Sequence, residues 1–340
     1  MIVVAGEALI DLVPASTLGP ASAADVGRAP AAGADSTPGA DSAALPALSP
    51  QRGGGPYNTA VALGRLGSPA AFCSRVSTDS FGASLLDGLH AAGVDTSLVQ
   101  RGAEPTTLAL ADISPDGSAG YGFYVEGTAD RLFTLPPALP DDVRALSLGT
   151  CSLVLEPGAS AYEALMRREA ARGVFTALDP NIRAGLIPDP DAYRARFRSW
   201  LPHIALLKLS EEDARWLAGA EDLPEAAAAD AVAGSVKEWL AAGPAAVVLT
   251  RGGDGLTAAT PAGEVTVPGV RVEVVDTIGA GDTVNAALLH RLDAHHALSP
   301  TALARLNAEA WRDILTFAAR AAALTCSRAG AEPPYASDLA

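Results

Sequence analysis

Residues 275–285 read VDTIGAGDTVN and join a β-branched run to an apolar helix through a Gly-Ala-Gly turn. The first N–H groups of a helix have no acceptor within the helix, so Gly279, Ala280 and Gly281 can point N–H groups at a phosphate. Asp282 would repel a resting phosphate, which suggests that it accepts a proton from a hydroxyl that attacks phosphorus. An ordinary turn with a favourable charge at a helix start is the alternative. The stretch therefore predicts a site for phosphoryl transfer.

A second glycine-rich segment lies near the N-terminus. Residues 53–67 read GGGPYNTAVALGRLG, in which Gly53, Gly54 and Gly55 let the backbone approach a ligand closely. Asn58 follows and offers both a donor and an acceptor to a hydroxyl, with a helix cap as its alternative role. The segment predicts a binding loop that leads into a short helix.

The strand pattern at residues 2–14, IVVAGEALIDLVP, is interrupted by carboxylates, and a buried carboxylate needs partners. Together with the two glycine-rich segments, this strand resembles the ribokinase-like (PfkB) sugar kinases. Its sequence GEALID, residues 6–11, is most similar to fructokinases and 2-keto-3-deoxygluconate kinases. The resemblance implies that Asp282 is the catalytic base, that Gly279–Gly281 form an anion hole, and that Asp11 accepts hydrogen bonds from two sugar hydroxyls. Glu7 is interpreted as a member of a structural ion pair rather than as a sugar contact.

Shorter motifs downstream match the same family in part. Arg183 ends the sequence DPNIR and is a candidate for contact with the substrate or the nucleotide phosphates. In KLSEED, residues 208–213, Ser210 and Asp213 stand where the family has Asn and Glu. The resemblance implies an indirect Mg²⁺-organising role for Asp213, while an ordinary helix N-cap at Ser210 is the alternative.

Further site residues follow from the resemblance. Asp130 could reach the substrate, and Asp276 and Ile278 are candidates for a monovalent cation site, although Pro334 stands where some members have a serine ligand. The resemblance assigns the nucleotide to Lys208, Ser210, Thr250, Gly252, Gly253, Gly255, Gly279 and Gly281. As a bare hairpin turn, the glycines after Thr250 would be unremarkable.

The expected fold is α/β, a ribokinase-like three-layer α/β/α sandwich with a mainly parallel central sheet and a small β-sheet lid, in one domain over residues 1–340. Strand patterns alternate with helical ones, as is typical of a parallel sheet covered on both faces. These strands are expected at Leu146 to Gly149, Val174 to Leu178, Ile204 to Leu209 and Ala246 to Thr250. Lid strands are expected at about 11–14 and 98–126, including a hairpin around 114–118, and a last helix at 301–324. Residues 15–50 have few large apolar side chains, which predicts a flexible insertion, with a regulatory lid as the alternative.

Composition limits the classes of function. The chain has 340 residues, a net charge of -15 and a pI near 4.7, which argues against a nucleic-acid partner. No apolar run is long enough for a membrane span, so a cytoplasmic protein is expected. The three cysteines are widely separated and support neither a disulfide framework nor a zinc site.

Rival classes of protein can be weighed against these motifs. A Walker-type NTPase needs Gly-Lys-Ser/Thr, which neither lysine provides, and a Rossmann enzyme would need a third glycine where Val284 stands. A non-catalytic sugar-binding regulatory protein remains open because fold does not dictate activity. The sequence predicts a kinase that uses ATP and Mg²⁺, with K⁺ as a further candidate ion, to phosphorylate a primary hydroxyl of a monosaccharide. Fructose is the expected sugar; 2-keto-3-deoxygluconate or another sugar or nucleoside, and a homodimer, stay open.

Overall fold

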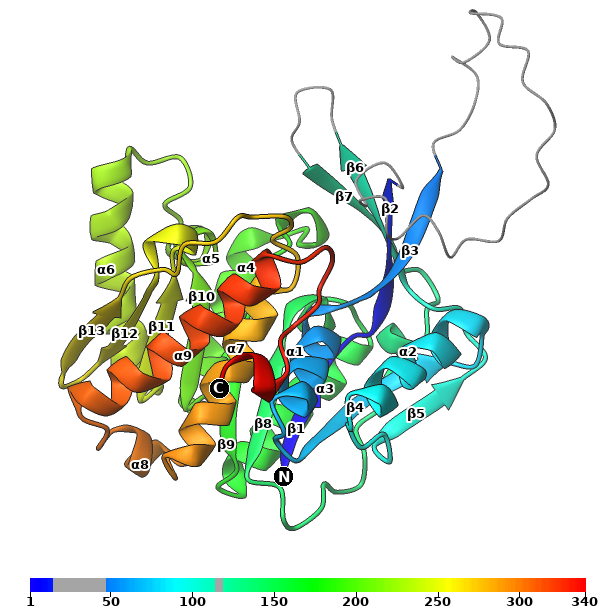
Figure 1. Cartoon of the computed structure of the whole chain (residues 1–340), viewed down its shortest axis with the longest axis horizontal. Coiled ribbons are helices and arrows are strands. Elements are labelled where there is room, and N and C mark those ends of the chain that lie inside the picture. The colour runs from blue at the N-terminus through cyan, green and yellow to red at the C-terminus, as the bar shows by residue number, and fades with distance from the viewer. Residues whose placement is uncertain (15–46, 114–118) are drawn as a thin grey trace, which may run out of the picture.

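The computed structural model describes residues 1–14, 47–113 and 119–340. Within these residues the main sheet has nine strands in the order β13-β12-β11-β10-β9-β8-β1-β4-β5 (Figure 1). All neighbouring pairs from β11 to β5 are parallel, whereas β12 and β13 are antiparallel at one edge, so the predicted, mainly parallel sheet is confirmed. The strands are β1 (Ile2–Ala5), β4 (Ala70–Ser77), β5 (Val99–Gly102), β8 (Ala145–Gly149), β9 (Phe175–Asp179), β10 (Leu206–Ser210), β11 (Ala246–Thr250), β12 (Leu256–Thr260) and β13 (Gly263–Val267).

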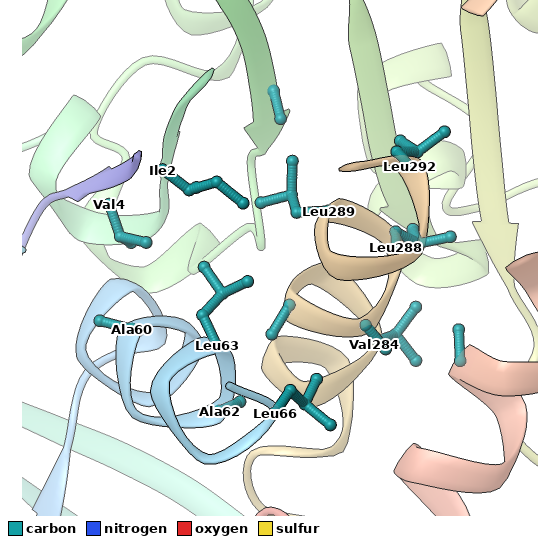
Figure 2. Packing of buried hydrophobic residues seen from close by; sticks show 14 of the residues in the cluster. Ile2, Val4, Ala60, Ala62, Leu63, Leu66, Val284, Leu288, Leu289 and Leu292 are labelled. Carbon is teal, nitrogen blue, oxygen red and sulfur yellow. The ribbon is translucent and has the colours of Figure 1, made fainter. Parts of the chain in front are cut away.

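Helices cover both faces of the main sheet, as predicted. Alternate residues of β1 point to opposite faces, so Ile2 packs in one hydrophobic cluster and Val3 in the other. Figure 2 shows Ile2 beside Leu63 of α1 and Leu289 of α7. One layer contains α1 (Gly55–Arg65), α2 (Ser80–Ala91), α7 (Ala280–Ala294) and α9 (Ala308–Cys326), and the other contains α3 (Gly158–Ala171), α4 (Pro190–Trp200), α5 (Glu211–Ala218) and α6 (Glu225–Ala242).

The C-terminal helix departs from the prediction of one helix over 301–324. The structure has a short α8 (Pro300–Leu303) and a separate α9 that begins at Ala308. The side chain of Asn307 accepts a hydrogen bond from the N–H of Ala310 at 2.9 Å and so caps the start of α9. An asparagine that satisfies an end N–H group favours a new helix start over a continuous helix.

Among the described residues a separate four-stranded sheet forms the lid, in the order β3-β2-β6-β7. Its strands are β2 (Leu9–Pro14), β3 (Leu48–Gly53), β6 (Leu108–Ile113) and β7 (Ala119–Tyr124). Strands β6 and β7 are antiparallel, which confirms the predicted hairpin, although its turn lies outside the described residues. Figure 1 shows this sheet standing at one end of the main sheet.

Two boundaries of the lid differ from the prediction. Residues 48–50 were assigned to the insertion, but they belong to β3, which pairs with β2 in register from Leu9 opposite Gly53 to Pro14 opposite Leu48. Residues 99–102 were assigned to the lid, but as β5 they pair with β4 in the main sheet. Both errors arise because strand pairing, unlike strand propensity, is set by distant partners. The remainder of the insertion, 15–46, lies outside the described residues.

The described residues contain no helix long and apolar enough to cross a membrane. The sequence predicts no disulfide framework. In the structure Cys73, Cys151 and Cys326 are free thiols, and the first two are buried.

Candidate active site

A cavity of about 440 Å³ lies where the lid faces the carboxyl ends of the parallel strands. In α/β sheets ligands bind at this edge because the loops after the strands converge there. The lid contributes Asp11 and Phe123, while loops after β1, β8 and β9 contribute Glu7, Thr150 and Arg183. The full lining is Glu7, Leu9, Asp11, Gly54, Gly55, Asn58, Phe123, Thr150, Cys151, Asn181, Arg183, Glu212, Thr277, Ile278, Gly279, Gly281 and Asp282.

Asp282 lies in the first turn of α7 and faces this cavity. Its Oδ2 accepts a hydrogen bond from Nδ2 of Asn58 at 2.8 Å, and its backbone oxygen accepts one from Thr59 at 3.4 Å. Its Oδ1 lies beside Gly55, 3.2 Å from the point where a Cβ on that glycine would stand. Burial raises the pKa of Asp282, an effect opposed by Asn58, Lys208 and Arg183. The carboxylate is therefore fixed in position and more basic than an exposed aspartate.

The Gly-Ala-Gly turn before Asp282 requires glycine at its first position. Gly279 has φ +76°, and a Cβ there would lie 2.7 Å from the Cβ of Ala331. Left-handed backbone and this close approach both exclude a side chain. Gly279 and Gly281 line the cavity, whereas Ala280 is the first residue of α7 and does not. The turn therefore brings the start of the helix against the cavity.

A buried lysine lies behind this turn. The Nζ of Lys208 is 3.1 Å from the point where a Cβ on Gly281 would stand, and it donates a hydrogen bond to Asp179 Oδ2 at 2.7 Å. Burial opposes the charge of Lys208, but Asp179, Asp213 and Asp282 together raise its pKa, so the ammonium stays protonated. Burial raises the pKa of Asp179 to about 6 despite this cation. A permanent positive charge thus stands next to the glycine turn.

Asp11 approaches the cavity from the lid. Burial raises its pKa to about 6, while the guanidinium of Arg183 opposes that shift. A Cβ on Gly53 would stand 1.9 Å from Asp11 Oδ2, so the glycine is needed for the carboxylate to occupy its place, although Gly53 itself does not line the cavity. Arg183 donates to the backbone and side-chain oxygens of Asn181 at 3.0 and 2.8 Å, which holds the guanidinium at the cavity wall.

Glu7 corrects one prediction. The sequence interpretation placed it in a structural ion pair, but among the described residues its carboxylate accepts hydrogen bonds from the Thr150 hydroxyl and from the Ser152 N–H instead. Without a cation, burial raises the pKa of Glu7 to about 7. Thr150, its partner, has φ 58°, a left-handed conformation that a β-branched residue rarely adopts and that is typical of functional sites.

Eight of the described lining residues were not predicted as site members: Glu7, Leu9, Phe123, Thr150, Cys151, Asn181, Glu212 and Thr277. Asn181 lies inside the DPNIR motif and Glu212 inside KLSEED, so a signal was present for these two. Thr150 and Cys151 follow β8 and have no motif of their own, so only their place after a parallel strand could have indicated them.

The structure does not bring Asp130 to the cavity wall. Its Oδ1 accepts hydrogen bonds from Thr107, from Thr128 at 3.1 Å and from the Arg131 N–H at 2.9 Å. It lies with Glu7 around a separate small space behind the site. These contacts place Asp130 at the base of the lid, and its contact with a substrate stays a prediction.

Ser210 and Asp213 form a reciprocal capping box at the start of α5. Ser210 Oγ accepts from the Asp213 N–H at 3.0 Å, and Asp213 Oδ2 accepts from the Ser210 N–H at 3.0 Å. Asp213 Oδ1 accepts from the Ile182 N–H at 2.7 Å, so the carboxylate also fixes the loop that carries Arg183. The helix-cap alternative is confirmed, while Glu212 is the neighbouring carboxylate that lines the cavity.

The proposed nucleotide loop follows β11 at the same sheet edge. Thr250 ends β11, Gly252 begins a single 3₁₀ turn, and Gly253 lies within it. Gly255 precedes β12, which pairs antiparallel with β11, so the hairpin alternative describes this loop. None of these four residues lines the cavity of about 440 Å³.

With this geometry established, comparison with known proteins identifies the family. The family described as pfkB family carbohydrate kinase matches residues 1–338. The chain belongs to this family of kinases.

Relatives of this kinase include several fructokinases. It is 39% identical to a fructokinase of Rhizobium leguminosarum bv. trifolii over 92% of this chain and 86% of that relative. It is 32% identical to a fructokinase of Klebsiella pneumoniae over 84% of this chain and 90% of that relative. A solved fructokinase from Xylella fastidiosa with bound ATP has a TM-score of 0.80 and 28% identity, over 99% of this chain and 96% of that chain.

In the kinase, the candidate cation residues tie the glycine turn to the C-terminal segment. Asp276 Oδ1 accepts from the Ile278 N–H at 3.0 Å, and its Oδ2 accepts from the Gly330 N–H at 2.9 Å. Ile278 lines the cavity. The described residues contain no group of three His, Cys, Asp or Glu side chains that could hold a metal. The observed role of Asp276 is to position the loop before Gly279.

Proposed function

We propose that this kinase transfers the γ-phosphoryl group of ATP to a primary hydroxyl of fructose. The observation that carries the proposal is the buried Asp282 carboxylate, which Asn58 holds at 2.8 Å beside a glycine turn and in the same cavity as Asp11. The fructokinase relatives, one of them solved with ATP, support both substrates.

The sugar is oriented by groups on both sides of the cavity. Asp11 accepts hydrogen bonds from two adjacent hydroxyls, a task that its two oxygens suit. The backbone at Gly54 and Gly55 allows close contact, and Asn58 fixes the acceptor oxygen near Asp282. Arg183 balances the negative charges of Asp11 and Asp282 and so keeps both available as acceptors.

Phosphoryl transfer then follows from the position of Asp282. As the sugar oxygen attacks the γ-phosphorus, its proton passes to Asp282, the new P–O bond forms and the bond to the ADP oxygen breaks. Charge on the transferring group is stabilised by N–H groups of Gly279–Gly281 and by the ammonium of Lys208. Lys208 also keeps Asp179 ionised in a buried environment.

The residues that would hold the nucleotide and its ions are proposed from the chemistry of their side chains and backbone. We propose that Thr250, Gly252, Gly253 and Gly255 hold the nucleotide, with Ser210 at the neighbouring strand end. Mg²⁺ is usually bound by one or two carboxylates plus substrate phosphates, and Glu212 in the cavity, with Asp213 behind it, fits that donor set. When bound, Mg²⁺ neutralises phosphate charge. A K⁺ site at Asp276 and Ile278 stays a proposal.

A coupled ADP-release assay over a panel of sugars tests this function. Fructose should give the highest kcat/KM, above 2-keto-3-deoxygluconate, ribose and a nucleoside. A higher kcat/KM for the keto acid, lost selectively in Arg183→Ala, would reassign the substrate. Sugar binding with no ADP release from any of them would instead identify a sugar-binding regulatory protein.

A further inference from the structure

We propose that a second cavity, distinct from the catalytic one, binds a small phosphate ester. It has a volume of about 410 Å³ and lies between α1, α2, strand β3 and residues 329–335. In Figure 1 the C-terminal segment passes next to α1, and α1, α2 and β3 neighbour one another. Its size is close to that of the catalytic cavity, at about 440 Å³, so it can hold a ligand of similar dimensions.

Two arginines give this cavity an affinity for anions. Arg52 of β3 contacts Ser84, with its Nε 3.2 Å from Oγ, and forms no ion pair with a described residue. Arg65 of α1 pairs with Glu332 at 2.6 Å, but its buried Nε has no hydrogen-bond partner among the described residues. Glu332 is the single carboxylate among the described residues of the lining. The described lining therefore carries two guanidinium groups and one carboxylate, although the chain as a whole has a net charge of -15. This local excess of positive charge favours the binding of an anion.

The remaining lining suits an ester rather than a bare ion. Guanidinium groups bind phosphate through paired N–H donors, which Arg52 of β3 and Arg65 of α1 can both supply to this cavity. Ile10, Val61 and Phe81 provide an apolar wall for a carbon skeleton. Glu332 is half exposed, and an ion pair of this kind contributes little, so an incoming phosphate can displace it from Arg65.

The cavity is connected to the glycine turn of the catalytic site. The N–H of Gly330 donates to Asp276 at 2.9 Å, and Ala331 packs against Gly279. Both Gly330 and Ala331 line the second cavity, as does Asn58, which holds Asp282. A ligand there therefore touches residues that position the catalytic groups.

The lid provides the second connection and gives the direction of the effect. Arg52 lies on β3 next to Gly53, against which the Asp11 carboxylate packs. A phosphate bridging Arg52 and Arg65 would tie β3 to α1 and fix Asp11 over the catalytic cavity. We therefore expect the ester to tighten fructose binding, and fructose to tighten ester binding by the same factor.

Calorimetry with glucose 6-phosphate tests the proposal, in the presence of a non-hydrolysable ATP analogue and with or without saturating fructose. The ester should bind with one site per chain, and fructose should lower its Kd about fivefold, the lower end of typical coupling. Arg52→Gln and Arg65→Gln should each abolish binding. Arg198→Gln, an exposed arginine of α4 on the other helix layer, is the matched control and should bind normally.

Glucose and inorganic phosphate complete the design. Glucose should not bind the second cavity, and inorganic phosphate should bind more weakly than the ester. Equal, Arg52-dependent binding of inorganic phosphate would assign the same site to free phosphate. No binding of either anion at millimolar concentration, or binding unchanged in Arg52→Gln, would overturn the proposal. Because this measurement needs no turnover, it is independent of whether fructose is phosphorylated.

Discussion

A few residues in this kinase have a side-chain environment or a backbone conformation that is energetically unfavourable for them. Asp282 and Glu7 are buried carboxylates and Asp11 is a partly buried one, all three have raised pKa values, and Thr150 has a left-handed backbone. Such features cost stability, and they cluster around one cavity. Burial thus prepares carboxylates to accept protons or hydroxyl hydrogen bonds.

Replacing Gly279 by alanine tests the glycine turn. The Cβ would stand 2.7 Å from Ala331 at φ +76°, so the turn must shift away from the position that stabilises the phosphoryl group. We expect kcat to fall at least about 10-fold and the free energy of unfolding to fall by about 1–3 kcal/mol. Gly234→Ala in α6, where the Cβ meets open space, is the control and should not lower either quantity. Unchanged kcat in Gly279→Ala would exclude the turn from catalysis.

Glu7→Gln should remove a pH dependence of stability. The folded pKa of Glu7 is about 7 against an ordinary 4.5, so between these values the folded chain keeps a proton that the unfolded chain releases. Wild-type stability should therefore fall as pH rises from 4.5 to 7, by up to about 3 kcal/mol from this residue. The variant should lack that contribution. Urea unfolding across this range measures it, and identical pH profiles would contradict the assigned burial.

At the scale of elements, strand ends organise the site. Glu7, Thr150 and Arg183 follow β1, β8 and β9, and Ser210 and Thr250 end β10 and β11. The parallel arrangement brings all five to one edge of the sheet although they are distant in sequence. Strand β2 of the lid then adds Asp11 to the cavity at that edge.

Because β2 and β3 pair with each other, the contribution of residues 15–46 between them can be tested by replacing the segment. Pro14 and Leu48 are directly opposite each other in the lid sheet, so a short turn can join the strands. Replacing 15–47 by a short Gly/Ser linker should leave the fructose KM and Tm nearly unchanged, because loop closure depends weakly on length. A large rise in KM with an unchanged Tm would show that the segment contributes to sugar binding. A linker of equal length but scrambled sequence is the control.

At the scale of the whole molecule, the sequence motifs predicted most of the layout. The alternating strand and helix patterns predicted the parallel sheet, and the glycine-rich segments predicted the loops at its edge. Pairings across the chain were not readable: residues 48–50 joined the lid, 99–102 joined the main sheet, and Asn307 divided the last helix. The roles of Glu7 and Asp130 depend on Thr150 and Thr107, partners that only the folded chain brings near.

The most direct test of the central claim compares Asp282→Asn with wild type in ADP release from fructose and ATP. The amide keeps the size of the side chain and the contact with Asn58 but cannot accept the proton, so kcat should fall at least about 100-fold while the fructose KM changes little. Asp230→Asn, at an exposed position of α6, is the matched control and should retain wild-type kcat. A near-wild-type kcat for Asp282→Asn would contradict the assignment of Asp282 as the base.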